Sequence, residues 1–202
     1  MLTVGHGTLE QDQLGALLAA AGVDLVVDVR RYPGSRRSPH VNREALARWL
    51  PARAIGYRWE EALGGRRRGQ PGSPHTAIRN ASFRAYADHM HSAEWRQALA
   101  VLLEEAGRRT VAVMCSESVW WRCHRRFIAD ACTLVHDVEV GNLMHDGRVH
   151  PHRVTDGARL AGDRIVYDAG AGKPSHLSLG AFGGVCQIDS RQAGHEPDRK
   201  RP

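Results

Sequence analysis

Apolar runs that alternate with helical segments are the feature of this sequence that most limits its fold. The runs LTVG (2–5) and LVVDVR (25–30) flank a segment whose leucines have helical spacing. The same order recurs where TVAVMC (110–115) precedes a helix around 123–132 and a strand predicted over 134–140. Strand–helix–strand units are built with parallel strands and a right-handed crossover. The sequence therefore predicts an α/β fold with a mostly parallel sheet flanked by helices, in a Rossmann-like or rhodanese-like three-layer arrangement.

We expect a single α/β domain over residues 1–159, because a chain of 202 residues has the usual length of one globular domain. Three further helices are predicted, over 42–50, 82–90 and 92–107. Asp146-Gly147 predicts a short hairpin near the C-terminal end of this domain. From 160 to 202 the sequence has many glycines and no sustained period, so we expect an irregular, partly disordered tail.

The formal charge of +6 is carried mostly by arginine, whose planar fork suits phosphate oxygens. DNA, RNA or a phosphate-bearing small molecule is therefore the expected partner, unless the arginines are merely solvated surface. Neither an apolar run of about 18 residues nor a signal-peptide pattern occurs, so we expect a cytoplasmic protein without a membrane partner. The four cysteines are too few and too unevenly spaced for a disulfide framework, so we expect reduced thiols.

The densest group of reactive side chains lies in VMCSESVWWRCHRRFIAD (113–130). Cys115 ends a predicted strand, and Cys123 and His124 begin the next predicted helix. Ligand sites of open parallel sheets lie at this edge, where a helix N-terminus attracts anions and lowers the pKa of a nearby thiol. The competing interpretation is that the cysteines are small core residues and that the tryptophans only cover the sheet.

Four sequence words carry a family resemblance: MCSESVWWRCHRRFIAD, DVRRYPGSRRSPHVN, ALGGRRR and FRAYADHM. With them the chain resembles the family known as domain of unknown function 488, over about residues 2–159. The resemblance implies a shared fold and a shared site around these words. It implies no particular reaction.

The catalytic residues expected from the sequence are Glu117, Asp28, His124 and Cys115. Asp28 and Glu117 follow predicted parallel strands, and paired carboxylates in unlike environments can divide acid and base roles. Asp28 could equally form a structural ion pair with Arg30. The expected substrate-binding residues are arginines that hold phosphates, aromatics that stack on a base, and one cysteine. They are Arg30, Arg36, Arg37, Tyr32, Arg66, Arg67, Trp120, Trp121, Arg122, Cys123 and Arg125.

The function expected first is hydrolysis at a base or its N-glycosidic bond, as in a DNA glycosylase, with Glu117 or Asp28 activating water and His124 as acid. One alternative is a cysteine-dependent, rhodanese-like sulfurtransferase that uses Cys115. Another is a non-enzymatic basic module that binds nucleic acid.

No cofactor is expected from the sequence. A metal site of Cys115, Glu117, Cys123 and His124 is conceivable, but no Cys-x-x-Cys pair occurs and the adjacent Cys123 and His124 would need an unusual bite. We therefore expect no metal.

Overall fold

The computed structural model describes residues 1–168. Its strands are β1 (Leu2–Gly5), β2 (Leu25–Asp28), β3 (Gly56–Trp59), β4 (Val111–Cys115), β5 (Gly141–Leu143), β6 (Val149–Pro151), β7 (Ala158–Ala161) and β8 (Arg164–Tyr167). Its α-helices are α1 (Gln11–Ala20), α2 (Arg43–Trp49), α3 (Ala81–His89), α4 (Ala93–Ala106) and α5 (Arg125–His136). Among the described helices, none has the length and apolar character needed to cross a membrane.

Six strands form the main sheet in the order β3-β2-β4-β1-β5-β6. Every neighbouring pair from β3 to β5 is parallel, and only β6 runs antiparallel, to β5. Both predicted strand–helix–strand units are therefore present, β1-α1-β2 and β4-α5-β5. The predicted mostly parallel α/β sheet is confirmed.

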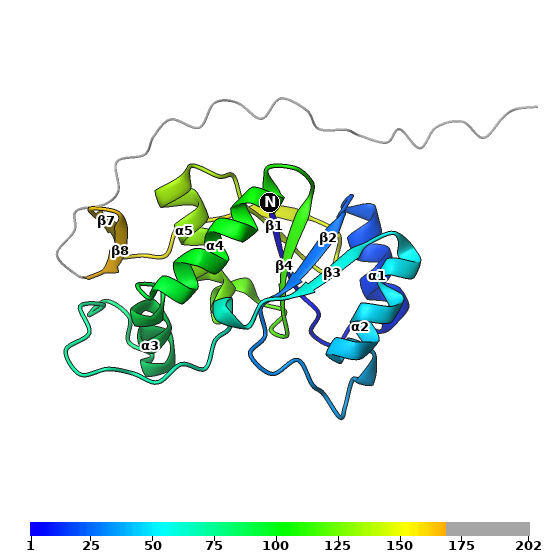
Figure 1. The fold of residues 1–202 in the computed structure, drawn as a ribbon, viewed down its shortest axis with the longest axis horizontal. Helices are drawn as coiled ribbons and strands as arrows, with labels where there is room; N and C mark the ends of the chain where they lie inside the picture. The colour runs from blue at the N-terminus through cyan, green and yellow to red at the C-terminus, as the bar shows by residue number, and fades with distance from the viewer. Residues whose placement is uncertain (169–202) are drawn as a thin grey trace, which may run out of the picture.

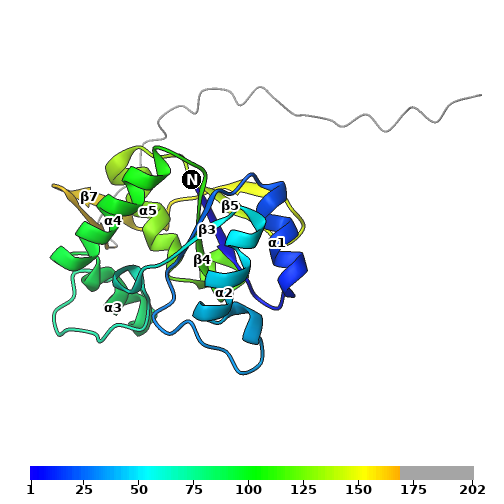
Figure 2. The same ribbon diagram turned by 45° about the vertical axis from the view of Figure 1, so that its right-hand side comes forward.

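The helices lie on both faces of this sheet, as Figures 1 and 2 show. Side chains alternate between the faces along each strand. Val26 and Met114 pack with the leucines of α1 and α2 on one face. Val27 and Val113 pack with α4 and α5 on the other. Two apolar cores on opposite faces give the expected three layers.

The hairpin signal at Asp146-Gly147 is also confirmed. Gly147 has a φ of +83°, a conformation that glycine adopts without cost, and it turns the chain from β5 into β6. The Asp146 carboxylate accepts a hydrogen bond from the Arg148 N–H at 3.0 Å, which closes the turn.

The strand predicted over 134–140 is wrong. Helix α5 continues to His136 and ends at Asp137, which has a left-handed φ of 52°. Leu134 and Val135 pack against the core from the last turn of the helix, so burial on a helical face outweighs their strand-like sequence. The strand that closes the unit is β5, which starts at Gly141.

Part of the expected irregular tail is ordered. Residues 158–167 form the separate β7–β8 hairpin, and the Tyr167 hydroxyl donates to Asp130 of α5 at 2.9 Å. The remainder of that segment, 169–202, lies outside the described residues.

Candidate functional site

The site is built around the end of β4, a central strand of the sheet. Cys115 is its last residue and lies beside Gly5, the last residue of β1. The chain then turns back across β1: a Cβ on Gly5 would lie 1.9 Å from the carbonyl oxygen of Glu117. Only glycine at position 5 leaves room for this turn, which sets Cys115 and Glu117 on the carboxyl edge of the sheet.

Three side chains at this edge form a group that we call the thiol–imidazole cluster: Cys115, Cys123 and His124. The Nδ1 atom of His124 lies 3.9 Å from the Cys115 sulfur and 3.7 Å from the Cys123 sulfur. The other ring nitrogen, Nε2, is 3.1 Å from the carbonyl oxygen of Val29. Because a carbonyl only accepts, Nε2 carries a proton there, which leaves Nδ1 to interact with the sulfurs.

The two thiols of the cluster differ in their pKa values. Hydrogen bonding from Cys123, with the nearby His124, holds the pKa of Cys115 well below the usual thiol value. Burial, with the hydrogen bond to Cys115, raises the pKa of Cys123 well above it. Cys115 is therefore the sulfur that carries a negative charge first.

Asp28 lies at the same edge but on the opposite face of the sheet. It is opposite Met114 in the parallel register and follows the α1/α2 face, whereas Cys115 follows the α4/α5 face. Its carboxylate is fully buried and accepts hydrogen bonds from the Arg30 Nε at 2.8 Å and Nη2 at 2.6 Å. Tyr57 donates to the same carboxylate at 2.9 Å. This geometry matches the structural ion pair that the sequence left open for Asp28.

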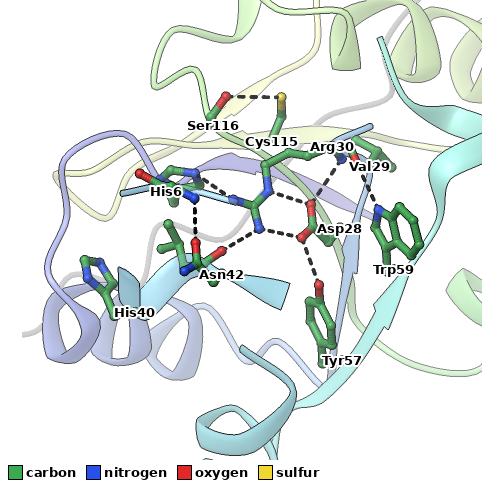
Figure 3. A network of polar contacts seen from close by, with 12 residues as sticks. His6, Asp28, Val29, Arg30, His40, Asn42, Tyr57, Trp59, Cys115 and Ser116 are labelled. Atoms are coloured by element: carbon green, nitrogen blue, oxygen red, sulfur yellow. Dashed lines mark hydrogen bonds and ion pairs between the residues drawn. The ribbon is translucent and has the colours of Figure 1, made fainter. Parts of the chain in front are cut away.

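Arg30 joins the buried Asp28 carboxylate to His6, the residue after β1, as Figure 3 shows. Its guanidinium lies between Asp28 and His6, 3.3 Å from the His6 Nε2, and also donates to the Val41 carbonyl at 2.7 Å. Burial, with the adjacent Arg30 charge, lowers the pKa of His6 from 6.5 to about 4. His6 is therefore neutral at physiological pH and can accept the Arg30 N–H.

A cleft of about 370 Å³ opens over the cluster. Eight of the predicted site residues line it: Arg30, Tyr32, Arg66, Cys115, Glu117, Arg122, Cys123 and His124. They come from segments that are far apart in the sequence, the loops after β2, β3 and β4. The shared cleft expected at the carboxyl edge of the sheet is therefore present for these residues.

The other predicted site residues lie elsewhere. Arg125 is buried and donates to the backbone carbonyls of Glu117 and Ser118, so it holds the turn. Arg67 is engaged by the carbonyls of residues 61, 62 and 64. Arg36 and Arg37 are exposed on the loop after β2, and Trp120 and Trp121 pack edge to face against each other. None of these four residues lines the cleft.

Two lining residues of α3, Phe83 and Tyr86, were missed by sequence reasoning. His6 and Arg31 also line the cleft, and each follows the end of a parallel strand, where the sequence predicts the edge of the sheet. Tyr86 comes from α3, and its ring lies 5.0 Å from the His124 ring. No sequence signal indicates which helix covers the cleft, because that depends on the path of the long loop before α3.

Comparison with known proteins identifies one family. The model of the family described as "Domain of unknown function DUF488" matches residues 10–132, more than half of the chain. The match includes the Asp28–Arg30 pair and the whole thiol–imidazole cluster. No curated protein and no solved structure matches the chain. The chain belongs to the DUF488 family.

Proposed function

We propose that this protein is a hydrolase that acts on a nucleotide or nucleic acid, at the base or its N-glycosidic bond, with Glu117 as the general base. The observation that carries the proposal is the composition of one cleft: the Glu117 carboxylate shares it with Arg66 and Arg122. A carboxylate that can activate water and cations that can hold phosphate are thus within one binding site.

Glu117 is better suited to the base role than Asp28. Its side chain is exposed to solvent at the cleft, and Oε1 accepts the Val119 N–H at 3.2 Å, which orients the carboxylate. Both Asp28 oxygens already accept hydrogen bonds in a buried network. Water can reach Glu117 without disruption of the fold.

The rim of the cleft supports a substrate with a base and a phosphate. Tyr32 is 62% exposed, and the guanidinium carbons of Arg31 and Arg66 lie 5.5 and 6.0 Å from its ring centre. An aromatic ring flanked by guanidinium groups is a surface on which a base can stack while the arginines hold its phosphate.

The test is a turnover assay on nucleosides, nucleotides and single-stranded DNA and RNA, with chromatographic detection of a released or altered base. We expect Glu117→Gln to abolish turnover and to retain binding. Binding should weaken steeply with salt, since phosphate contacts release counterions. Retained binding with no turnover by the wild-type protein would exclude hydrolysis of these substrates and favour the non-enzymatic module.

A second candidate, a cysteine-dependent sulfurtransferase, is favoured by the low pKa of Cys115 and its approach to His124. In that reaction the Cys115 thiolate bonds to the outer sulfur of thiosulfate, the sulfur–sulfur bond of thiosulfate breaks, and sulfite leaves. Cyanide then takes the outer sulfur as thiocyanate and restores the thiolate. Thiocyanate production that Cys115→Ser abolishes and Glu117→Gln leaves intact would select this candidate over hydrolysis.

A further inference from the structure

We propose that Cys115, Cys123 and His124 bind a zinc ion whose remaining coordination position faces the cleft. The two sulfurs and the Nδ1 of His124 all lie within 4.8 Å of one another. All three residues line the cleft that contains Glu117. Two thiolates and one imidazole are a common zinc ligand set, and three protein ligands are typical of zinc sites that keep a position open.

The two nitrogen–sulfur distances within the cluster fit a tetrahedral ion. Zinc bonds of about 2.3 Å to sulfur and 2.1 Å to nitrogen place the two ligand atoms roughly 3.6 Å apart in a tetrahedron. The His124 Nδ1 lies 3.7 Å from the Cys123 sulfur and 3.9 Å from the Cys115 sulfur. Small rotations of the side chains would complete the site.

The adjacent positions of Cys123 and His124, which in sequence argue against a metal, are reconciled by the backbone. Cys123 is extended, with φ −125° and ψ 149°, and His124 is helical, with φ −62° and ψ −21°. This change of conformation between neighbouring residues directs both side chains to the same point. The backbone at the start of α5 therefore allows the adjacent residues Cys123 and His124 to bind one ion.

The surroundings of His124 orient it as a ligand. Its Nε2–H donates to the Val29 carbonyl, the arrangement that usually fixes a metal-binding histidine with the other nitrogen toward the ion. Tyr86 packs against the ring at a centroid distance of 5.0 Å. A Cβ on Gly65 would lie 3.0 Å from Nδ1, so glycine there leaves the ligand atom uncrowded.

The two sulfurs are buried and within reach of backbone N–H groups. Cys115 and Cys123 are 6% and 3% exposed, and each receives a backbone hydrogen bond, from Glu117 and Arg125 respectively. Such bonds stabilise the charged form of a thiol in a buried place. Zinc would neutralise two thiolates whose charges would otherwise repel each other at this distance.

The inferred ion would also supply what hydrolysis needs. Zinc with an open position lowers the pKa of a coordinated water toward neutrality, and a neighbouring carboxylate then serves as the proton acceptor. This use of the ion rests on the proposed function of Glu117. The metal site itself does not, because its ligands and their distances are independent of the substrate.

The direct test is the zinc content of the full-length protein, purified without chelator and reconstituted with zinc alone. We expect about one zinc ion per chain in the wild type, as in other three-ligand sites. Cys115→Ser, Cys123→Ser and His124→Ala should each lose it. Cys132→Ser is the matched control, since Cys132 is a buried thiol of α5 outside the cluster, and Cys186→Ser tests the cysteine outside the described residues. Both should retain zinc.

Cobalt binding by the wild type provides a test that does not depend on whether the variants fold. Titration of the metal-free wild type with Co²⁺ should produce sulfur-to-metal charge-transfer and tetrahedral absorption bands, and bound zinc should protect Cys115 from iodoacetamide. A wild type without these bands, or with rapid Cys115 alkylation in excess zinc, would overturn the metal site. Zinc binding without any hydrolysis would overturn the proposed function alone. Hydrolysis that depends on Glu117 in metal-free protein would overturn the catalytic use of the ion alone.

Discussion

Arg30 donates two side-chain hydrogen bonds to the fully buried carboxylate of Asp28, at 2.8 and 2.6 Å. The pair connects the core to the cleft, since Arg30 also reaches His6 and lines the cleft wall. The Asp28–Arg30 pair lies beside the cleft and not at the reacting atoms. Its loss should therefore lower the stability of the fold, which can be measured.

Asp28→Asn should lower the free energy of unfolding by about 3–5 kcal/mol, because it leaves the buried Arg30 charge without its partner. Urea denaturation measures this loss. The control is Asp12→Asn, which removes an exposed ion pair with Arg53 and should cost less than about 1 kcal/mol. Equal, small losses in the two variants would show that the buried pair is not structural.

Gly5→Ala should displace the turn after β4, because the new Cβ would lie 1.9 Å from the Glu117 carbonyl oxygen. We expect a loss of roughly 1–3 kcal/mol in unfolding free energy, the usual cost of overpacking, together with weaker zinc binding. Gly34→Ala is the control, since a Cβ there meets nothing within 4 Å. Thermal unfolding and cobalt titration measure both effects, and unchanged values for Gly5→Ala would contradict the close crossing of the two segments.

His75 should make stability depend on pH. It is buried against His91, Asp88 and Tyr167, and burial, with the His91 charge, lowers its pKa below 6.5. Asp168 also acts on it and favours the charged form. The unfolded chain therefore binds a proton that the folded protein does not, so this contribution is complete above pH 6.5 and is lost as the pH falls below it.

The variant His75→Asn keeps an acceptor for the Tyr167 N–H but removes the titration. Urea denaturation at pH values above and below 6.5 should show that the free energy of unfolding of this variant depends less on pH than that of the wild type. His150→Asn, on the exposed strand β6, should keep the wild-type dependence. Parallel curves for His75→Asn and the wild type would exclude His75 as the source.

Tyr32→Ala should weaken binding of single-stranded DNA or RNA by about 1–3 kcal/mol if a base stacks on the exposed ring, and Tyr32→Phe should retain binding. Trp121→Ala is the matched control: Trp121 is 51% exposed but outside the cleft lining. Fluorescence anisotropy with a labelled oligonucleotide measures the difference. A larger loss in Trp121→Ala than in Tyr32→Ala would move the binding surface to the turn before α5.

The sequence by itself determined the fold class and the edge of the sheet at which the reactive residues meet. Apolar runs alternating with helical segments require parallel strands, and parallel strands end on one edge. Cys115 and Glu117 could be assigned to that edge because Cys115 ends such a run and Glu117 lies two residues beyond it. The end of α5 could not be located from local propensity, since Leu134 and Val135 are buried from a helix by contacts with the distant core.

Only the tertiary structure decided which residues at the edge face the cleft. Asp28 and Cys115 both end parallel strands, but the register of β2 against β4 sets Asp28 opposite Met114 and so on the other face. Register depends on long-range pairing, and a shift of one residue would reverse the faces. The convergence of Cys123 and His124 likewise depends on the dihedral angles where α5 begins, which the order of the residues does not specify.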